Sequence, residues 1–217
     1  MAVIASEADL LGAKRAVADL FELRLDALAP IVDRLEREIR QLNAPLIVTA
    51  RHPREGGAYA LRAARRAELL LRFLKHASCI DLELHALREL AAVHRRARAR
   101  NVGLLVSVHE LQDTPPVASL RRKAHRAAAA GADIFKIATR TDTSEQVDRL
   151  LGFFDAPDVD LPISAMGVGK FGQVTRLELA ARGSVLNYVH LVSTQVAGQF
   201  SLAEWKRALR YLHRAPR

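Results

Sequence analysis

The chain has 217 residues, of which 50% are hydrophobic and 26% charged, and Gly and Pro together number 19. This composition excludes a disordered or fibrous protein and provides enough apolar side chains for a sizeable core. The apolar runs are only a few residues long, which excludes a membrane span, and the formal net charge is +9.

The first residues and the cysteine content indicate a cytoplasmic protein. The opening segment MAVIASEADL has no basic region and reaches Glu7 and Asp9 early, so we expect no secretory signal. The single cysteine, Cys79, cannot form an intramolecular disulfide, and no Cys/His cluster has the spacing of a zinc site. We therefore expect a reducing environment, no bound metal and no membrane association.

A strongly basic chain is typical of nucleic-acid-binding proteins, and this alternative has to be weighed. Only six of the 33 basic residues are lysine, and genomic base composition alone can produce such an arginine bias. The arginines lie mostly in amphipathic helical stretches beside Glu and Ala, which is typical of a solvated helix face. We favour a small anionic substrate over nucleic acid as the partner of this positive field.

Short β-branched runs alternate with Ala-, Arg- and Leu-rich helical patterns along the chain. Eight strands are predicted, at Ala2–Ala5, Leu20–Leu25, Leu46–Ala50, Cys79–Leu84, Gly103–Val108, Asp133–Ala138, Pro162–Met166 and Leu186–Leu191. After a short first connection at Glu7–Arg15, helices are predicted at Ile31–Gln41, Leu61–His76, Ala86–Arg100, Val117–Ala130, Ser144–Phe154, Val174–Ala181 and Leu202–His213.

This alternation predicts an α/β protein with a parallel sheet covered by helices. Eight strand–helix units can close into a compact (β/α)8 TIM barrel, and the length is near the lower end for that fold. An open doubly wound sheet is the alternative. Because the chain contains no linker-like or low-complexity stretch, we predict one domain over residues 1–217.

Several predicted strands carry charges where a buried parallel strand should be apolar. In the segment Phe21–Asp26, the charged residues Glu22, Arg24 and Asp26 fall at every second position and share one side of the strand. Asp81 and Glu83 alternate with leucine and isoleucine in the same way. Buried charges cost several kcal/mol each unless they are compensated, so we expect them to form a site rather than a salt-bridge layer that only fills the barrel.

Active sites of such barrels lie at the carboxyl ends of the strands. The residues expected there are Glu22, Arg24, Arg51, Glu83, His109 and Lys136. A lysine and a histidine on adjacent strands, surrounded by arginines and carboxylates, are typical of Schiff-base chemistry on an anionic carbonyl compound. A different Schiff-base barrel lyase, aldolase-like and acting on a phosphorylated substrate, fits the same residues.

The segment Gly167–Gly172 matches the pattern G-x-G-x-x-G between a strand and a helix. A dinucleotide fingerprint normally belongs to a first βαβ unit and has an acidic residue at the end of the next strand, and neither holds here. A turn that binds a phosphate or a carboxylate at a helix N-terminus stays as an interpretation.

Seven motifs, in order, resemble those of the type I 3-dehydroquinate dehydratases, the Schiff-base enzymes of the shikimate pathway of aromatic amino acid biosynthesis. The resemblance covers nearly the whole chain from about Asp19 onward. The segments that carry it are Glu22–Asp26 (E-x-R-x-D), Thr49–Gly57 (T-x-R-x-x-x-E-G-G), Ile80–Leu84 (I-D-x-E-L), Ser107–Glu110 with Thr114 and Pro115, Gly131–Ala138 (G-A-D-x-x-K-I-A), Gly169–Arg176, and the pairs Gly183-Ser184 and Gly198-Gln199.

The resemblance implies a lyase that dehydrates 3-dehydroquinate to 3-dehydroshikimate without a metal or an organic cofactor. Lys136 would form an imine with the substrate ketone, His109 would act as the acid/base, and Glu55 would hold and tune His109. Arg176 would pair with the substrate carboxylate. The remaining substrate-binding residues implied are Glu22, Arg24, Arg51, Gln199 and, in the lid, Gln195.

Departures from the family pattern concern mainly the lid loop. The family usually reads S-x-A-P-G-Q, where this chain has Gln195 for the serine and Ala197 for the proline. Thr175 replaces a serine, and the segment before Asp19 is shorter than usual. We expect a mobile lid over residues 194–199 and a homodimer. A weakly active paralogue that binds a quinate-like acid is a further alternative.

Overall fold

A computed structural model of the chain describes residues 1–212. Its strands are β1 (Ala2–Ile4), β2 (Phe21–Arg24), β3 (Leu46–Thr49), β4 (Cys79–Glu83), β5 (Gly103–Glu110), β6 (Ile134–Arg140), β7 (Ile163–Val168) and β8 (Val189–His190). Its α-helices are α1 (Glu7–Ala13), α2 (Val32–Glu38), α3 (Ala63–Phe73), α4 (Ala91–Arg98), α5 (Val117–Ala129), α6 (Ser144–Asp155), α7 (Gly172–Ala181) and α8 (Leu202–Leu212).

Five 3₁₀ turns join these elements, and local sequence explains several boundaries. The turns are η1 (Ala29–Ile31), η2 (Ile39–Gln41), η3 (Pro53–Glu55), η4 (Leu74–His76) and η5 (Leu84–Ala86). Thr143 and Gln146 form a capping box that starts α6, in which each side chain bonds the other residue's backbone N–H. Gly131, with a φ of 76°, ends the segment after α5 in the left-handed conformation that glycine tolerates best.

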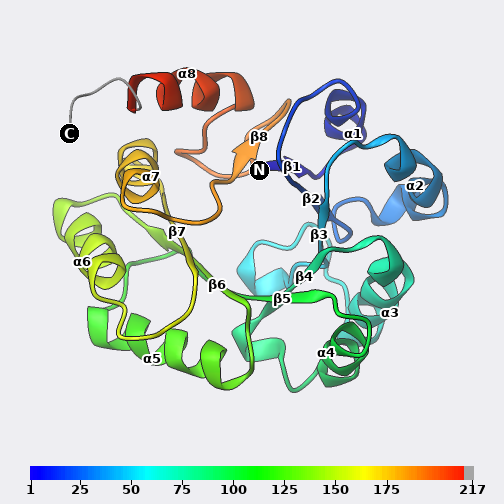
Figure 1. Ribbon diagram of the computed structural model, residues 1–217, viewed down its shortest axis with the longest axis horizontal. Coiled ribbons are helices and arrows are strands. Elements are labelled where there is room, and N and C mark those ends of the chain that lie inside the picture. The colour runs from blue at the N-terminus through cyan, green and yellow to red at the C-terminus, as the bar shows by residue number, and fades with distance from the viewer. Residues whose placement is uncertain (213–217) are drawn as a thin grey trace.

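All adjacent strands are parallel and follow the order β7-β6-β5-β4-β3-β2-β1-β8. The sheet curls into a (β/α)8 TIM barrel with the helices around it, as predicted (Figure 1). In the described residues, β7 and β8 share no ladder of backbone hydrogen bonds. Serine side chains close this seam: Ser164 Oγ donates to the Leu186 carbonyl at 2.8 Å, and Ser184 Oγ accepts from the Ala165 N–H at 3.0 Å.

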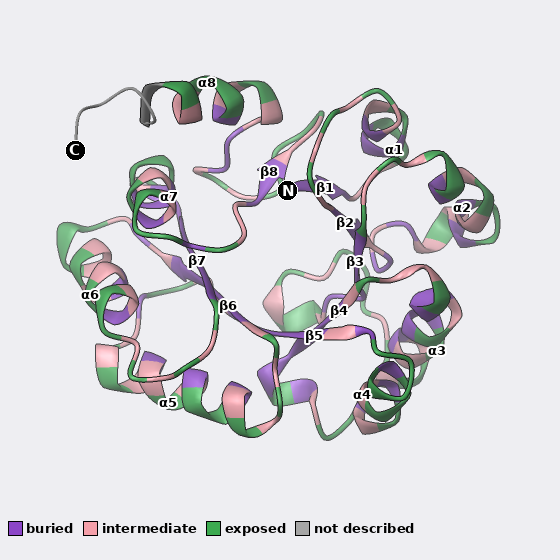
Figure 2. Ribbon diagram, viewed as in Figure 1, coloured by how far each residue is buried: buried purple, intermediate pink, exposed green. Residues whose placement is uncertain are grey.

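The core has two separate parts. The larger part lies between the outer side of the sheet and the helices, whose buried faces turn toward the strands (Figure 2). The smaller part lies inside the barrel and consists of Met1, Val3, Ile47, Leu105, Ala138, Met166 and Tyr188. No helix within residues 1–212 is long and apolar enough to cross a bilayer.

Element order agrees with the prediction, whereas some boundaries differ for reasons visible in the structure. The helix expected from Ala86 begins at Ala91, because η5 and the turn after it come first. The strand expected over Leu186–Leu191 shrinks to β8, because the carbonyls of Leu186 and Tyr188 accept side-chain bonds from Ser164 and Arg176 instead. The predicted end of the last helix, His213, lies outside the described residues.

The hydrogen bonds that Ser164 and Ser184 make between β7 and the chain before β8 predict an effect on the stability of the protein. Ser184→Ala removes the acceptor of the buried Ala165 N–H, so we expect the free energy of unfolding to fall by about 1–3 kcal/mol in urea denaturation. Ser144→Ala, at an exposed position in the first turn of α6, should change it by less than about 0.5 kcal/mol. Equal effects of the two substitutions would contradict a closing role for Ser184.

Candidate active site

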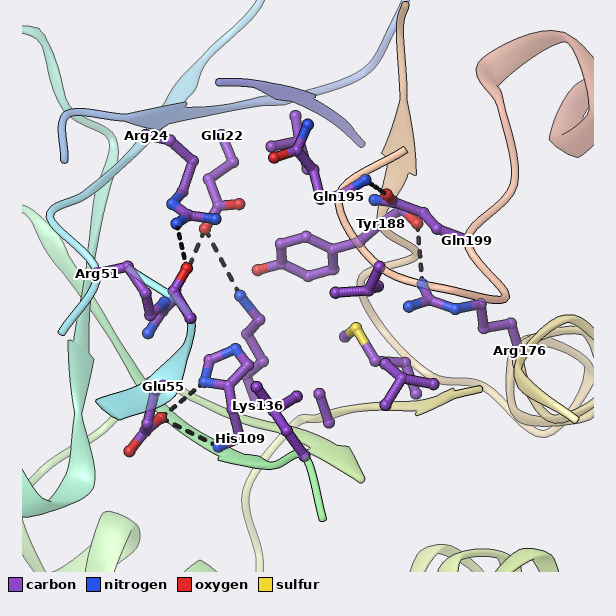
Figure 3. A pocket seen from close by; sticks show the side chains of 17 residues that line it. Glu22, Arg24, Arg51, Glu55, His109, Lys136, Arg176, Tyr188, Gln195 and Gln199 are labelled. Carbon is purple, nitrogen blue, oxygen red and sulfur yellow. Dashed lines mark hydrogen bonds and ion pairs between the residues drawn. The ribbon is translucent and has the colours of Figure 1, made fainter. Parts of the chain in front are cut away.

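A cavity of about 270 Å³ opens at the carboxyl-terminal end of the barrel (Figure 3). The structure brings together in its lining all nine residues singled out as catalytic or substrate-binding. They are Glu22, Arg24, Arg51, Glu55, His109, Lys136, Arg176, Gln195 and Gln199. They come from six of the eight strand–loop units, so only the closed barrel assembles the set.

Lys136 lies deeper in the barrel than a strand-end residue. It is the third residue of β6, because that strand continues to Arg140, and its side chain is 4% exposed. Its Nζ donates to Asp81 Oδ2 at 3.1 Å and lies 3.5 Å from Glu22 Oε1. The same Nζ lies 4.0 Å from the centre of the Tyr188 ring, which favours a cation there through the ring's π face. The lysine is therefore held from two sides by negative charge.

Arg51 links the buried carboxylates beneath the cavity. Its guanidinium donates to both oxygens of Asp81, at 3.1 and 2.5 Å, to Glu83 Oε1 at 3.1 Å and to Ser107 Oγ at 2.6 Å. Arg51 and Lys136 hold the pKa of Asp81 well below its usual value, against the opposing effect of burial. Arg66 of α3 bonds the other oxygen of Glu83. The charge expected on β4 is thus compensated by arginine on both sides.

His109 and Glu55 form a pair with a defined direction. Glu55 Oε2 accepts the backbone N–H of His109 at 3.0 Å and lies 2.7 Å from its Nδ1. Because one oxygen already accepts a backbone donor, the arrangement favours the tautomer with the proton on Nδ1. Nε2 then keeps a free electron pair on the other side of the ring, as a general base requires.

Burial shifts both groups toward their neutral forms. The pKa of His109 falls well below its ordinary value, through burial first and then through the positive charges of Arg51 and Lys136. The pKa of Glu55 rises to about 8, through burial first, with Glu83 and Asp81 adding to the rise and Arg51 opposing it. Near neutral pH the imidazole is therefore unprotonated and able to accept a proton.

Glu22 and Arg24 are fixed at the rim by neighbours on β3 and its loop. Thr49 Oγ1 donates to Glu22 Oε1 at 2.8 Å. Arg24 makes a bidentate pair with Asp26, at 2.9 and 2.7 Å, and its side chain is 13% exposed. Asp26 in turn accepts the backbone N–H groups of Arg51 and Ala58 at 3.0 Å each. These bonds hold the rim side chains in place before any ligand arrives.

Arg176 on α7 is a buried cation whose bonds go only to carbonyl groups. It is 4% exposed, and it donates to the carbonyls of Gly167 at 3.1 Å and Tyr188 at 3.0 Å. No carboxylate in residues 1–212 forms an ion pair with it, and burial alone lowers its pKa to about 10. A buried guanidinium facing a cavity without a counter-charge is suited to an anionic ligand.

The segment Thr194–Gln199 lies across one side of the cavity and is docked on the Gly167–Gly172 turn. Gln195 and Gln199 line the cavity, and Gln199 Oε1 accepts the Gln195 N–H at 2.9 Å. A side chain at Gly198, whose φ is 81°, would come within 2.7 Å of the Gly172 Cα. The two backbones therefore touch directly.

The glycine-rich turn has no spare donors for a phosphate. The backbone N–H groups of residues 169 to 172 donate to Ala197 O, Asp142 Oδ1, Thr141 O and Gly169 O, respectively. The bonds of the turn therefore give no support to the phosphate-binding interpretation of Gly167–Gly172, and the glycines serve close packing.

Tyr188 is the main lining residue that the sequence did not single out. It is 5% exposed, and among residues 1–212 its hydroxyl has no hydrogen-bond partner. Its ring lies between Lys136 and the two lid glutamines (Figure 3). In the predicted strand Leu186–Leu191, side chains alternate between the two faces of the sheet. This alternation was the only signal in the sequence that could have placed the Tyr188 side chain inside the barrel. Within the described part of the chain, no cluster of His, Cys, Asp or Glu is grouped as a metal site requires.

Comparison with known proteins identifies a consistent set of relatives. The family model for type I 3-dehydroquinase matches residues 3–216. A 3-dehydroquinate dehydratase of Methanosarcina mazei is 31% identical over 207 residues, which are 90% of this chain and 86% of the relative. The crystal structure of 3-dehydroquinate dehydratase from Aquifex aeolicus has a TM-score of 0.81 at 26% identity, covering 99% of this chain and 100% of that one.

A second solved structure shares the fold at lower identity. The 3-dehydroquinate dehydratase of Geobacillus kaustophilus has a TM-score of 0.88 at 24% identity, and the match covers 100% of this chain and 91% of that one. This likeness supports the closed-barrel assignment over the open doubly wound sheet.

The buried charge network predicts a pH-dependent stability difference. Asp81→Asn leaves Arg51 and Lys136 without their shared carboxylate, so the free energy of unfolding should fall by about 3–5 kcal/mol near pH 7. Since the folded-state pKa of Asp81 is lowered, its contribution is complete above the unfolded-state pKa of about 4 and fades as the pH falls below it.

Denaturant titrations of the unchanged protein and of Asp81→Asn at several pH values measure this difference in the free energy of unfolding. Asp160→Asn, at an exposed aspartate, is the matched control and should show no such gap. A gap that is constant from pH 7 to acid would contradict the assigned role of the Asp81 charge.

Proposed function

Because the chain belongs to the type I 3-dehydroquinase family, we propose that its barrel cavity dehydrates 3-dehydroquinate to 3-dehydroshikimate through an imine on Lys136. One observation carries this proposal. A buried lysine, a histidine with a free Nε2 and a buried arginine without a counter-charge line the same cavity. They match the ketone, the acidic C2 proton and the carboxylate of that substrate.

The Lys136 ammonium would pass one proton to the ketone oxygen, and the free amine would attack the C3 carbon. The oxygen then leaves as water with a second nitrogen proton, and the third stays on nitrogen, so the imine is protonated. The carboxylates of Asp81 and Glu22, 3.1 and 3.5 Å from Nζ, stabilise that positive charge. The imine withdraws electrons from C2 and so makes its protons more acidic. The face of the Tyr188 ring adds to the stabilisation of the cation.

His109 would then move the proton. Nε2 takes one C2 proton, the C2–H electron pair forms the enamine, and the C1–oxygen bond breaks as His109 returns the proton to the leaving hydroxyl. Glu55 holds the ring through Nδ1 at 2.7 Å and stabilises the imidazolium that forms between the two steps. Water then attacks the product imine and releases Lys136.

Arg176 would fix the substrate by its carboxylate and so place the ketone over Lys136. A planar guanidinium suits such a group because it can donate two parallel hydrogen bonds. The ring hydroxyls would be bound by residues around the rim and lid: Glu22, Arg24, Arg51, Gln195 and Gln199. Arg51 already bonds three protein partners, so in this proposal its main contribution is positive charge.

The wider setting is also part of the proposal. We infer a single domain over residues 1–217, a homodimer, a cytoplasmic location and a role in the shikimate pathway, with no nucleic-acid partner. An aldolase-like lyase acting on a phosphorylated substrate has less support, because the Gly167–Gly172 turn offers no free N–H groups. Analytical ultracentrifugation of the full chain tests the dimer.

Covalent trapping tests the reaction directly. Borohydride with 3-dehydroquinate should reduce the imine and attach the substrate carbon skeleton to Lys136, as located by peptide mass mapping. Lys136→Ala should abolish trapping and lower kcat by several orders of magnitude with the fold retained. Lys170→Ala, at an exposed lysine, is the control and should trap normally. A label on Lys170 would refute the assignment.

Carboxylate binding by Arg176 predicts a specific kinetic defect. Arg176→Lys keeps a positive charge but loses the bidentate geometry, so kcat/KM should fall about 10- to 100-fold, as expected for loss of one charged hydrogen bond. Arg182→Lys, on an exposed arginine at the end of the same helix, should leave kcat/KM unchanged. If both variants behave alike, Arg176 does not bind the carboxylate.

A further inference from the structure

Glu55 has a second histidine neighbour on the side away from the substrate cavity. Its Oε1 lies 2.8 Å from Nδ1 of His85, while its Oε2 faces His109. His85 belongs to η5, the turn that directly follows β4. The His85 side chain is 42% exposed and the His109 side chain 12%. One carboxyl group therefore joins a buried imidazole to an imidazole at the surface.

A separate cavity of about 250 Å³ opens on this outer side. Glu55, His85 and His109 contribute to its lining, together with Glu110, Lys123 and Arg126. Glu55 and His109 thus lie in the wall between the two cavities. Solvent in the outer cavity can reach His85 without passing through the substrate cavity.

The bonds to Glu55 determine where its proton lies. Oε2 accepts the backbone N–H of His109 and lies 2.7 Å from Nδ1, so in the Nδ1–H tautomer assigned above it is the acceptor oxygen. A proton on the carboxyl group must then be on Oε1, the oxygen that faces His85. With its pKa raised to about 8 by burial, Glu55 carries that proton at neutral pH.

We propose that His85 is a positioning residue that completes a proton relay, His109–Glu55–His85, between the substrate cavity and solvent. The relay rests on the proposed function. When His109 Nε2 takes the C2 proton, Glu55 transfers its Oε1 proton to His85 Nδ1 and becomes a carboxylate beside the new imidazolium. His85 releases a proton from Nε2 to water. When His109 protonates the leaving hydroxyl, a proton returns along the same route, so the protons balance over one turnover.

Other charged groups act on the relay but do not replace its last member. From the inner side, Arg51 lowers the pKa of Glu55, and Asp81 and Glu83 raise it. The His52 ring lies edge-on to His85, with centroids 4.7 Å apart. From β5 and α5, Lys123 and Glu110 face the outer cavity as an ion pair at 2.6 Å, beside the exposed Arg126. All of these groups persist when His85 is replaced.

The decisive measurement is kcat as a function of pH for His85→Phe. Below about pH 8 the Glu55 proton then has no acceptor, so kcat should fall roughly ten-fold relative to the unchanged protein. Above pH 8 Glu55 is ionised without help, and the two values should converge. A ratio that is constant from pH 6 to 9 would indicate a merely structural role and overturn the relay.

Two further variants sharpen the measurement. His125 is an exposed histidine 3.6 Å from Asp158 that is not among the lining residues of either cavity, so His125→Phe should follow the unchanged protein at every pH. In His85→Ala, added imidazole should restore kcat below pH 8, because it can enter the outer cavity and accept the proton. Failure of this rescue together with a constant kcat ratio would exclude a proton-accepting role for His85.

A readout without turnover separates this proposal from the proposed function. In ¹⁵N-histidine NMR of the full chain, the ring signals of His85 and His109 should both report the Glu55 titration, and Glu55→Gln should remove that shared step. If His85 does not sense Glu55, the relay is wrong even in an active enzyme. If the shared step is present and no 3-dehydroshikimate forms, the proposed function fails and the relay does not.

Discussion

The bidentate pair between Arg51 and Asp81 is the interaction on which the site depends. It lies in the barrel interior, where neither charge could remain without the other, and it also positions Ser107, Glu83 and Lys136. The apolar residues Ile47 and Leu105 belong to the buried cluster inside the same barrel. The low-dielectric surroundings strengthen the charge interactions of Arg51 and Asp81 with their neighbours. Burial in the same surroundings keeps His109 neutral.

Much of this arrangement follows from the sequence, because strand alternation is a strong geometric constraint. Charges at every second position of Glu22–Asp26 and of Asp81–Glu83 have to face one way, and parallel strands bring their carboxyl ends together. The convergence of Lys136 and His109 could therefore be predicted from two short segments. Strand and helix order followed from the alternating patterns for the same reason.

Other features depend on contacts between distant segments, which no local pattern encodes. The seam between β7 and the chain before β8 is closed by Ser164 and Ser184, two serines that look ordinary in sequence. Tyr188 enters the site because its backbone carbonyl is held by Arg176. The His85–Glu55 contact joins η5 to η3, about 30 residues away along the chain, and the helix predicted from Ala86 gave no sign of it.

The contact of Gly198 with Gly172 has a consequence for how the lid can diverge. The loop is seated through backbone atoms, with the Gly169 N–H bonded to the Ala197 carbonyl at 2.9 Å, so its attachment does not use the side chains of residues 195 and 197. The residues at these two positions can therefore be exchanged, as proline for Ala197, while the anchor stays the same. Substrate selectivity and loop stiffness can evolve there independently, whereas any side chain at residue 198 would force the backbones of Gly198 and Gly172 apart.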